Sequence, residues 1–169
     1  MKSIRLIKIT AKLRETLENG SPHFEAHYNA KLGAAIDLVR QVVEQTLTNV
    51  DGGSDESPWG GHLAVDDNSR AVIGTCGFKS PPAGEATVEI AYFTFPEYEG
   101  QGYATTMAGK LVEAARRSPE VRRIIARTLP EPNASTRVLK KVGMQFVGEV
   151  IDPEDGRVWE WQIMRQGGA

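Results

Sequence analysis

Residues 88–105 read VEIAYFTFPEYEGQGYAT, and this stretch sets the expected course of the chain. Its first half is a mostly apolar run that reads as a β-strand, and an amphipathic helix pattern begins at Tyr103. Gly100 and Gly102 lie just before that helix. A helix start presents free backbone N–H groups and the positive end of the helix dipole. The junction therefore predicts an anion site that suits a diphosphate.

The flanking segments predict a mixed α/β fold with the order β-α-α-β-β-β-α-β-α-β-β. Expected strands cover residues 5–10, 62–65, 71–78, 86–95, 121–129, 144–151 and 157–164. Expected helices cover residues 12–18, 34–50 and 103–117, with a last helix from position 133 or 135 to about 142. Short turns make the middle strands antiparallel, whereas the strand–helix–strand unit over 86–129 makes its two strands parallel. We expect a mostly antiparallel sheet of six or seven strands flanked by about four helices.

Composition predicts a single domain over residues 1–169, with 40% hydrophobic and 25% charged residues. The net charge of -2 gives no global positive field that would favour nucleic acid or an anionic membrane as a partner. The sequence has no run of about 20 apolar residues that would predict a membrane span, so a cytoplasmic protein is the default expectation. Cys76 is the only cysteine, and its apolar surroundings indicate a core residue rather than a nucleophile.

Three kinds of phosphate loop compete for the glycine-rich junction. A Walker loop needs G-x-x-x-x-G-K-[ST], and the sequence contains no such run. A dinucleotide fingerprint needs G-x-G-x-x-G/A, but Thr105 stands at its last position and antiparallel strands precede the loop. The third kind is a loop for the diphosphate of coenzyme A.

Two motifs resemble the GNAT superfamily of acetyl-CoA-dependent N-acyltransferases. The family signature [QR]-x-x-G-x-[GA] is matched at Gly102 and Ala104 and departs at Glu99. PEYEGQGYAT, residues 96–105, resembles the ribosomal-protein-alanine acetyltransferase (RimJ/RimL-like) branch, as does PNASTRVLKKVGMQFVGE, which begins at position 132. The resemblance extends over about residues 61–162. It implies a GNAT-like fold and transfer of an acetyl group from acetyl-CoA to a primary amine.

The resemblance also implies which residues bind acetyl-CoA. In the family, loop N–H groups hold the diphosphate, and the backbone of the fourth strand pairs with pantetheine. One or two residues of the helix that follows the next strand also contact the cofactor. The residues in these positions are Phe93, Thr94, Phe95, Gly100, Gln101, Gly102, Tyr103, Ala104, Thr105, Asn133 and Ser135. Helix capping is the alternative role for the last two.

Glu89 is the candidate catalytic base, because it interrupts an apolar strand on the same face as Ala91 and Phe93. The alternative is a solvent-facing glutamate or a structural partner of an arginine. Many family members carry a proton-donating tyrosine in the helix where this chain has Leu139. Ser135 matches the serine thought to serve instead in the RimJ/RimL-like branch, although its spacing from the preceding asparagine is one residue shorter.

The acceptor site is the least determined part of the sequence. Trp59, in the loop 51–61, is a candidate cover for it, and His62 is a candidate wall residue. The acceptor is either a small amine or a protein N-terminus, and the protein is either a monomer or a homodimer. His23 and His27 lack the order of a zinc motif, so we expect no metal. The competing function is a non-catalytic acyl-CoA sensor or interaction module.

Overall fold

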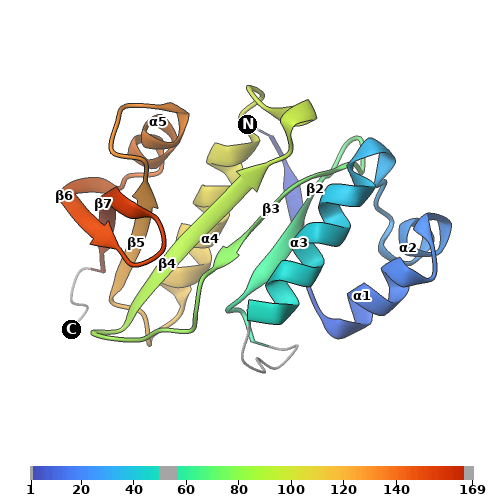
Figure 1. Ribbon diagram of the computed structural model, residues 1–169, viewed down its shortest axis with the longest axis horizontal. Helices are drawn as coiled ribbons and strands as arrows, with labels where there is room; N and C mark the ends of the chain where they lie inside the picture. Colours follow the sequence, from blue (N-terminus) through green and yellow to red (C-terminus); the bar gives the residue numbers. More distant parts are fainter. Residues whose placement is uncertain (1, 50–56, 166–169) are drawn as a thin grey trace.

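The computed structural model describes residues 2–49 and 57–165 (Figure 1). The strands are β1 (Ile4–Lys8), β2 (Gly61–Asp66), β3 (Val72–Phe78), β4 (Thr87–Thr94), β5 (Arg123–Thr128), β6 (Gln145–Asp152) and β7 (Gly156–Met164). The helices are α1 (Ala11–Glu18), α2 (Ser21–Tyr28), α3 (Ile36–Asn49), α4 (Tyr103–Arg117) and α5 (Ala134–Lys141). Short 3-10 turns, η1 (Gly33–Ala35) and η2 (Pro96–Tyr98), precede α3 and α4.

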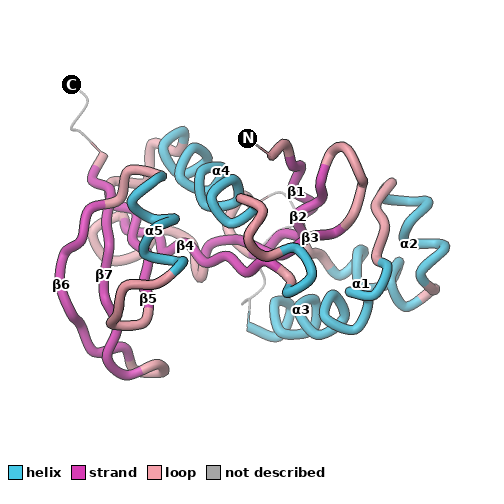
Figure 2. The backbone as a smooth tube through the Cα atoms, turned by 90° about the horizontal axis from the view of Figure 1, so that it is seen from above, coloured by secondary structure: helices cyan, strands magenta, loops and turns pink. Residues whose placement is uncertain are grey.

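The strands form a seven-stranded sheet in the order β1-β2-β3-β4-β5-β7-β6. Within this sheet, the β4–β5 pair is parallel, as the strand–helix–strand unit predicts, and its other neighbours are antiparallel. In Figure 2, α4 lies on one face of the sheet, and α1 and α3 lie on the other. The mixed, mostly antiparallel sheet expected from the sequence is confirmed.

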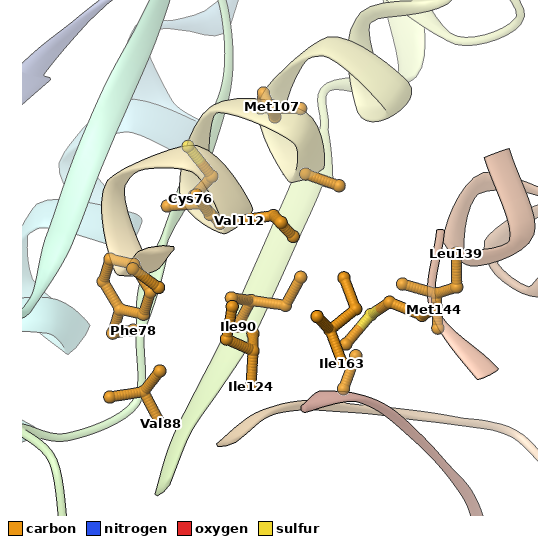
Figure 3. Close-up of a cluster of buried hydrophobic side chains, with 14 of the residues drawn as sticks. Cys76, Phe78, Val88, Ile90, Met107, Val112, Ile124, Leu139, Met144 and Ile163 are labelled. Carbon is orange, nitrogen blue, oxygen red and sulfur yellow. The ribbon is translucent and has the colours of Figure 1, made fainter. Parts of the chain in front are cut away.

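Apolar side chains fill both sides of the sheet. Between α4 and the sheet, side chains such as Met107 of α4, Ile90 of β4 and Ile124 of β5 form one cluster (Figure 3). A second cluster lies beneath the first three helices, where Val39 packs with strand residues. Cys76 is 3% exposed, and burial raises the pKa of its thiol to about 12. It is therefore the inert core residue that the sequence predicts.

One helix was not predicted. α2 occupies a segment whose Pro22 and Asn29 argue against a long helix. Pro22 stands in the first turn, where proline costs no hydrogen bond, and Asn29 ends the helix with a φ of 52°. These residues mark the ends of a short helix rather than excluding one. The helix predicted over residues 34–50 begins later in the structure, at Ile36. Position 50, the predicted end of this helix, lies outside the described part of the chain.

In residues 2–49 and 57–165, no helix has the length and apolar character to cross a membrane. No cluster of three potential metal ligands occurs in the same residues.

Candidate active site

The site lies where β4 and β5 part. The two strands pair only at one end, where Thr87–Glu89 faces Arg123–Ile125. Beyond Glu89, β4 keeps its pairing with β3, but no further pairing with β5 exists in the described chain. Where the two strands part, the side of β4 that faces β5 has no strand partner among the described residues. An extended ligand with amide groups, such as pantetheine, can pair with the backbone on that side.

The glycine loop lies beyond the open end of β4. Gly100 and Gly102 have φ values of 75° and 91°, in the left-handed region that glycine adopts without strain. A Cβ atom would meet no atom within 4 Å at either position, so the need for glycine lies in the backbone conformation. Gly102 is the N-cap of α4 and supplies no side-chain cap. The first N–H groups of α4 are therefore available for an anion.

The side chains around the start of α4 mostly serve other purposes. The Tyr103 ring is buried, and its hydroxyl donates a hydrogen bond to Asp66 Oδ1 at 3.0 Å. Ala104 and Thr105 are half-buried, and Gln101 is exposed. What this segment offers a diphosphate is its backbone.

The three predicted pantetheine-binding residues differ in their exposure and in their hydrogen-bond partners within the protein. Phe93 is 44% exposed, and the Thr94 hydroxyl is buried without a hydrogen-bond partner among the described residues. Phe95 is 1% exposed; its N–H donates to the Ile73 carbonyl, and its own carbonyl accepts from Tyr98. The backbone of Phe95 thus already has hydrogen-bond partners within the protein, unlike the hydroxyl of Thr94.

An open cleft of about 880 Å³ lies on the α3 face of β3 and β4. Its floor includes Thr75, Ala91 and Phe93, and one wall is the side of α3 that carries Gln41 and Gln45. The β6–β7 turn contributes a carboxylate to it. The lining residues are Leu38, Gln41, Val42, Gln45, Thr46, Gly61, Thr75, Cys76, Gly77, Phe78, Lys79, Ala91, Tyr92, Phe93 and Glu154.

A smaller cavity of about 150 Å³ lies in the gap between β4 and β5. The candidate base Glu89 and the candidate proton donor Ser135 both line it, so the structure brings these two predicted residues together. The other lining residues are Lys79, Ile90, Ala91, Tyr92, Ala126 and Arg127. Lys79, Ala91 and Tyr92 also line the larger cleft, and this is where the two spaces adjoin.

Glu89 stands between two cations. Its side chain is 14% exposed; Oε2 lies 3.3 Å from Lys79 Nζ, and Oε1 lies 3.8 Å from Arg127 Nε. Oε1 is also buried without a hydrogen bond from the described residues. An ionised carboxylate only accepts hydrogen bonds, so a donor on a bound ligand could bond to Oε1.

Arg127 connects Glu89 to a charged cluster that the sequence did not reveal. It donates to Asp152 Oδ2 at 2.8 Å and to Glu160 Oε2 at 3.2 Å, and Arg123 binds the other oxygen of Glu160 at 2.7 Å. Burial lowers the pKa of Arg127, but these carboxylates outweigh it and the net pKa is raised. Backbone N–H groups of the β6–β7 turn, followed by Arg127, lower the pKa of Asp152.

Asn133 and Ser135 lie at the start of α5 with different surroundings. Asn133 Oδ1 accepts from the N–H of Thr136 at 3.0 Å, which makes Asn133 the cap of α5. Ser135 is half-buried beside Tyr92, whose buried hydroxyl has no well-formed hydrogen bond with a described residue. Burial raises the pKa of Tyr92, and the Ser135 hydroxyl offsets part of that rise. The sequence analysis did not single out Tyr92. Strand alternation places its side chain on the other face of β4 from Glu89.

The two predicted acceptor residues do not line the described cleft. Trp59 is 7% exposed and packs edge-on against Phe78, with ring centroids 4.9 Å apart. His62 is half-buried in β2 with its Nδ1 atom enclosed, and burial and Lys8 lower its pKa. The Trp59 ring thus packs in the hydrophobic core.

Comparison with known proteins gives a consistent result. Residues 6–145 match the acetyltransferase (GNAT) domain family. An uncharacterized N-acetyltransferase from Bacillus subtilis (strain 168), YnaD, is 40% identical over 65 residues, which are 38% of each chain. The matches to curated relatives thus span half of those proteins or less.

Solved structures show the same fold. The ribosomal-protein-S5-alanine acetyltransferase from Vibrio fischeri has a TM-score of 0.64 at 18% identity, over 97% of this chain and 93% of that one. RimL, a ribosomal L7/L12 α-N-protein acetyltransferase solved with coenzyme A, has a TM-score of 0.66 at 15% identity, over 97% and 95%.

Proposed function

The chain belongs to the acetyltransferase (GNAT) family, and we propose that it transfers an acetyl group from acetyl-CoA to a primary amine in a ternary complex. One observation carries the proposal. The gap between β4 and β5 has an uncapped helix start beyond one end and a buried carboxylate at the other. These features suit the two ends of acetyl-CoA, a diphosphate and a thioester that an amine attacks.

The backbone supports cofactor binding. The N–H groups at the start of α4 would hold the diphosphate, with Gly100 and Gly102 permitting the loop conformation. The open side of β4 at Phe93 and Thr94 would pair with pantetheine. The buried, unpartnered hydroxyl of Thr94 is consistent with a ligand partner. Acetyl-CoA supplies an activated acetyl group as a thioester.

Glu89 would act as the base. An alkylamine with a pKa near ~10.4 is almost fully protonated at pH 7, and forming the neutral amine costs about 4.6 kcal/mol. A positioned carboxylate accepts that proton, directly or through water. The amine nitrogen then bonds to the carbonyl carbon, the carbon–sulfur bond breaks, and the sulfur leaves as a thiolate. The second proton of the nitrogen passes to this thiolate, directly or through water, and gives coenzyme A.

The hydroxyl groups of Ser135 and Tyr92 would stabilise the thiolate. Both residues line the small cavity, Ser135 from α5 and Tyr92 from β4. A raised pKa keeps the Tyr92 phenol protonated at neutral pH, so both groups can donate a hydrogen bond to sulfur.

Two acceptor classes fit the open, partly polar cleft: a protein N-terminus and a small amine. Among the structural neighbours, the Vibrio fischeri enzyme acts on a ribosomal protein, whereas SpeG chimeras are spermidine N-acetyltransferases. The Gln41 and Gln45 side chains on α3 would serve either class, because amides both donate and accept hydrogen bonds.

Thiol release with a panel of amines and N-terminal peptides tests the activity. We expect at least one acceptor to release coenzyme A faster than water does. Thermal stabilisation by acetyl-CoA is the companion measurement. Stabilisation without thiol release from any acceptor would favour the sensor function, and no stabilisation at millimolar acetyl-CoA would contradict both functions.

A further inference from the structure

Lys79 places a primary amine inside the site. It follows β3 directly, its side chain is 45% exposed, and its Nζ lies 3.3 Å from Glu89 Oε2. Lys79 also lines both the acceptor cleft and the cavity between β4 and β5. Its ammonium group therefore sits against the candidate base, at the junction of the two spaces.

That position is the one an acceptor amine must reach. An acceptor needs an amine near a carboxylate that can remove its proton, beside the space that holds the thioester. Because Lys79 meets both conditions without an external substrate, we propose that the protein acetylates its own Lys79. This inference rests on the proposed acetyltransferase function.

The chemistry is the same transfer with an internal acceptor. Glu89 takes one proton from the Lys79 ammonium, and the neutral amine attacks the carbonyl carbon of acetyl-CoA. A carbon–nitrogen bond forms, the carbon–sulfur bond breaks, and the sulfur leaves as a thiolate. The second proton of the attacking nitrogen passes to the departing thiolate, directly or through water, so coenzyme A and Nε-acetyl-Lys79 are the products.

The surrounding charges give the modification a consequence. Glu89 Oε1 faces Arg127 at 3.8 Å, while Oε2 faces Lys79. Acetylation removes the positive charge of Lys79 and leaves Arg127 as the cation beside Glu89. It also places an apolar acetyl group in the opening between the two cavities.

The chain contains a matched control in Lys12. Its Nζ lies 3.9 Å from a carboxylate oxygen of Glu15, and both side chains are 64% exposed. Lys12 is thus another lysine beside a glutamate, with better access to solvent and no contact with either cavity. Uncatalysed acetylation by acetyl-CoA should favour Lys12, whereas catalysed acetylation should favour Lys79.

The experiment incubates the full chain with isotopically labelled acetyl-CoA and measures labelled peptides by mass spectrometry over time. We expect Lys79 to be labelled about 100-fold faster than Lys12, the usual contribution of a positioned base. Glu89→Gln should remove most of that difference without changing the labelling of Lys12. The Lys79 rate constant should not depend on protein concentration, because the reaction is intramolecular.

Equal labelling of Lys79 and Lys12, or an Lys79 rate constant proportional to protein concentration, would overturn the proposal. An unlabelled Lys79 in a protein that acetylates an external amine would overturn this inference and leave the proposed function intact. If acetyl-CoA stabilises the protein but neither Lys79 nor any external amine is acetylated, the proposed function fails as well.

Discussion

One end of the β4–β5 gap is built from backbone atoms, and the other end is built from side chains. Near the start of α4, the candidate anion site consists of backbone N–H groups and two glycines with positive φ. At the other end, the candidate catalytic centre consists of charged side chains around Glu89, which come from strands far apart in the sequence. A backbone site depends on local conformation, whereas a side-chain site depends on the whole sheet. Four substitutions test this difference.

Glu89→Gln should have the largest effect. Removing the base should lower turnover about 100- to 1,000-fold, since a positioned proton acceptor contributes that much. Acetyl-CoA affinity, measured by calorimetry, should change less than about twofold because the diphosphate is bound at the opposite end. Glu149→Gln, at an exposed position of β6 outside both cavities, is the control. Full turnover in the Glu89 variant would rule out Glu89 as the base.

Arg127→Met should lower both stability and turnover. The change leaves Asp152 without its arginine and Glu160 with Arg123 alone, so the midpoint of unfolding in urea should fall. Turnover should fall because the Arg127 guanidinium, 3.8 Å from Glu89 Oε1, no longer helps to hold the Glu89 side chain in place.

Arg123→Met provides the comparison for that prediction. Arg123 also binds Glu160, and its side chain is similarly buried, 23% exposed against 28% for Arg127. No ion pair joins Arg123 to Glu89 in the described chain. It should therefore lose stability with little loss of turnover, and equal turnover in the two variants would show that Arg127 has only a structural role.

Gly102→Ala should weaken acetyl-CoA binding while leaving the catalytic end unchanged. Alanine at a φ of 91° costs about 1 kcal/mol, and relief of that strain would move the N–H groups that hold the diphosphate. We expect an increase of about fivefold in the acetyl-CoA dissociation constant by calorimetry.

Gly109→Ala, within α4, is the matched control for Gly102→Ala. The nearest atom to its new Cβ would be Val142 Cγ1 at 4.0 Å, so the methyl group fits. This variant should bind acetyl-CoA normally and be more stable by up to about 1 kcal/mol. Unchanged affinity in both variants would contradict the diphosphate site.

Asp66→Asn should have the smallest effect, and one that depends on pH. The N–H of Ser69 first, and then the Ser69 and Tyr103 hydroxyls, lower the pKa of Asp66 against the opposing effect of burial. The native pKa lies below the unfolded value, so this stabilisation is present above the unfolded pKa and disappears as pH falls through the native one.

Thermal unfolding across pH measures this effect. Asp66→Asn should be less stable than the wild type by about 1 kcal/mol at pH 7, with the difference vanishing in acid. Asp66 also binds Tyr103 at the start of α4. A loss of acetyl-CoA affinity larger than that of Gly102→Ala would mean that side chains, rather than backbone, define this end of the gap.

The same difference explains how much the sequence predicted. Helix α4 was predicted with the observed bounds because its apolar stripe and the preceding glycines are local signals. The parallel crossover followed from the element order. Glu89 and Ser135 were predicted and do line one cavity, whereas the hydrogen bonds of the Phe95 backbone to β3 and η2 had no sequence signal.

The charged cluster had no sequence signal. Arg127 and Glu160 are 33 positions apart, and only the β5–β7 register places them opposite each other. Lys79 and Asp152 come from two further segments, and each is an ordinary polar residue near a strand end. Strand alternation gives the face of each side chain but not its neighbours, so this part of the site required the structure.

The short β4–β5 pairing also predicts where the protein unfolds locally and exchanges its amide hydrogens. Three residue pairs join the two halves of the sheet, while the core beneath α4 draws on strands from both halves. Slow amide hydrogen exchange should therefore be found where α4 covers the strands, and fast exchange along the open edge of β4. A ligand that pairs with that edge would slow exchange on both sides of the gap, and would act as a missing strand in the middle of the sheet.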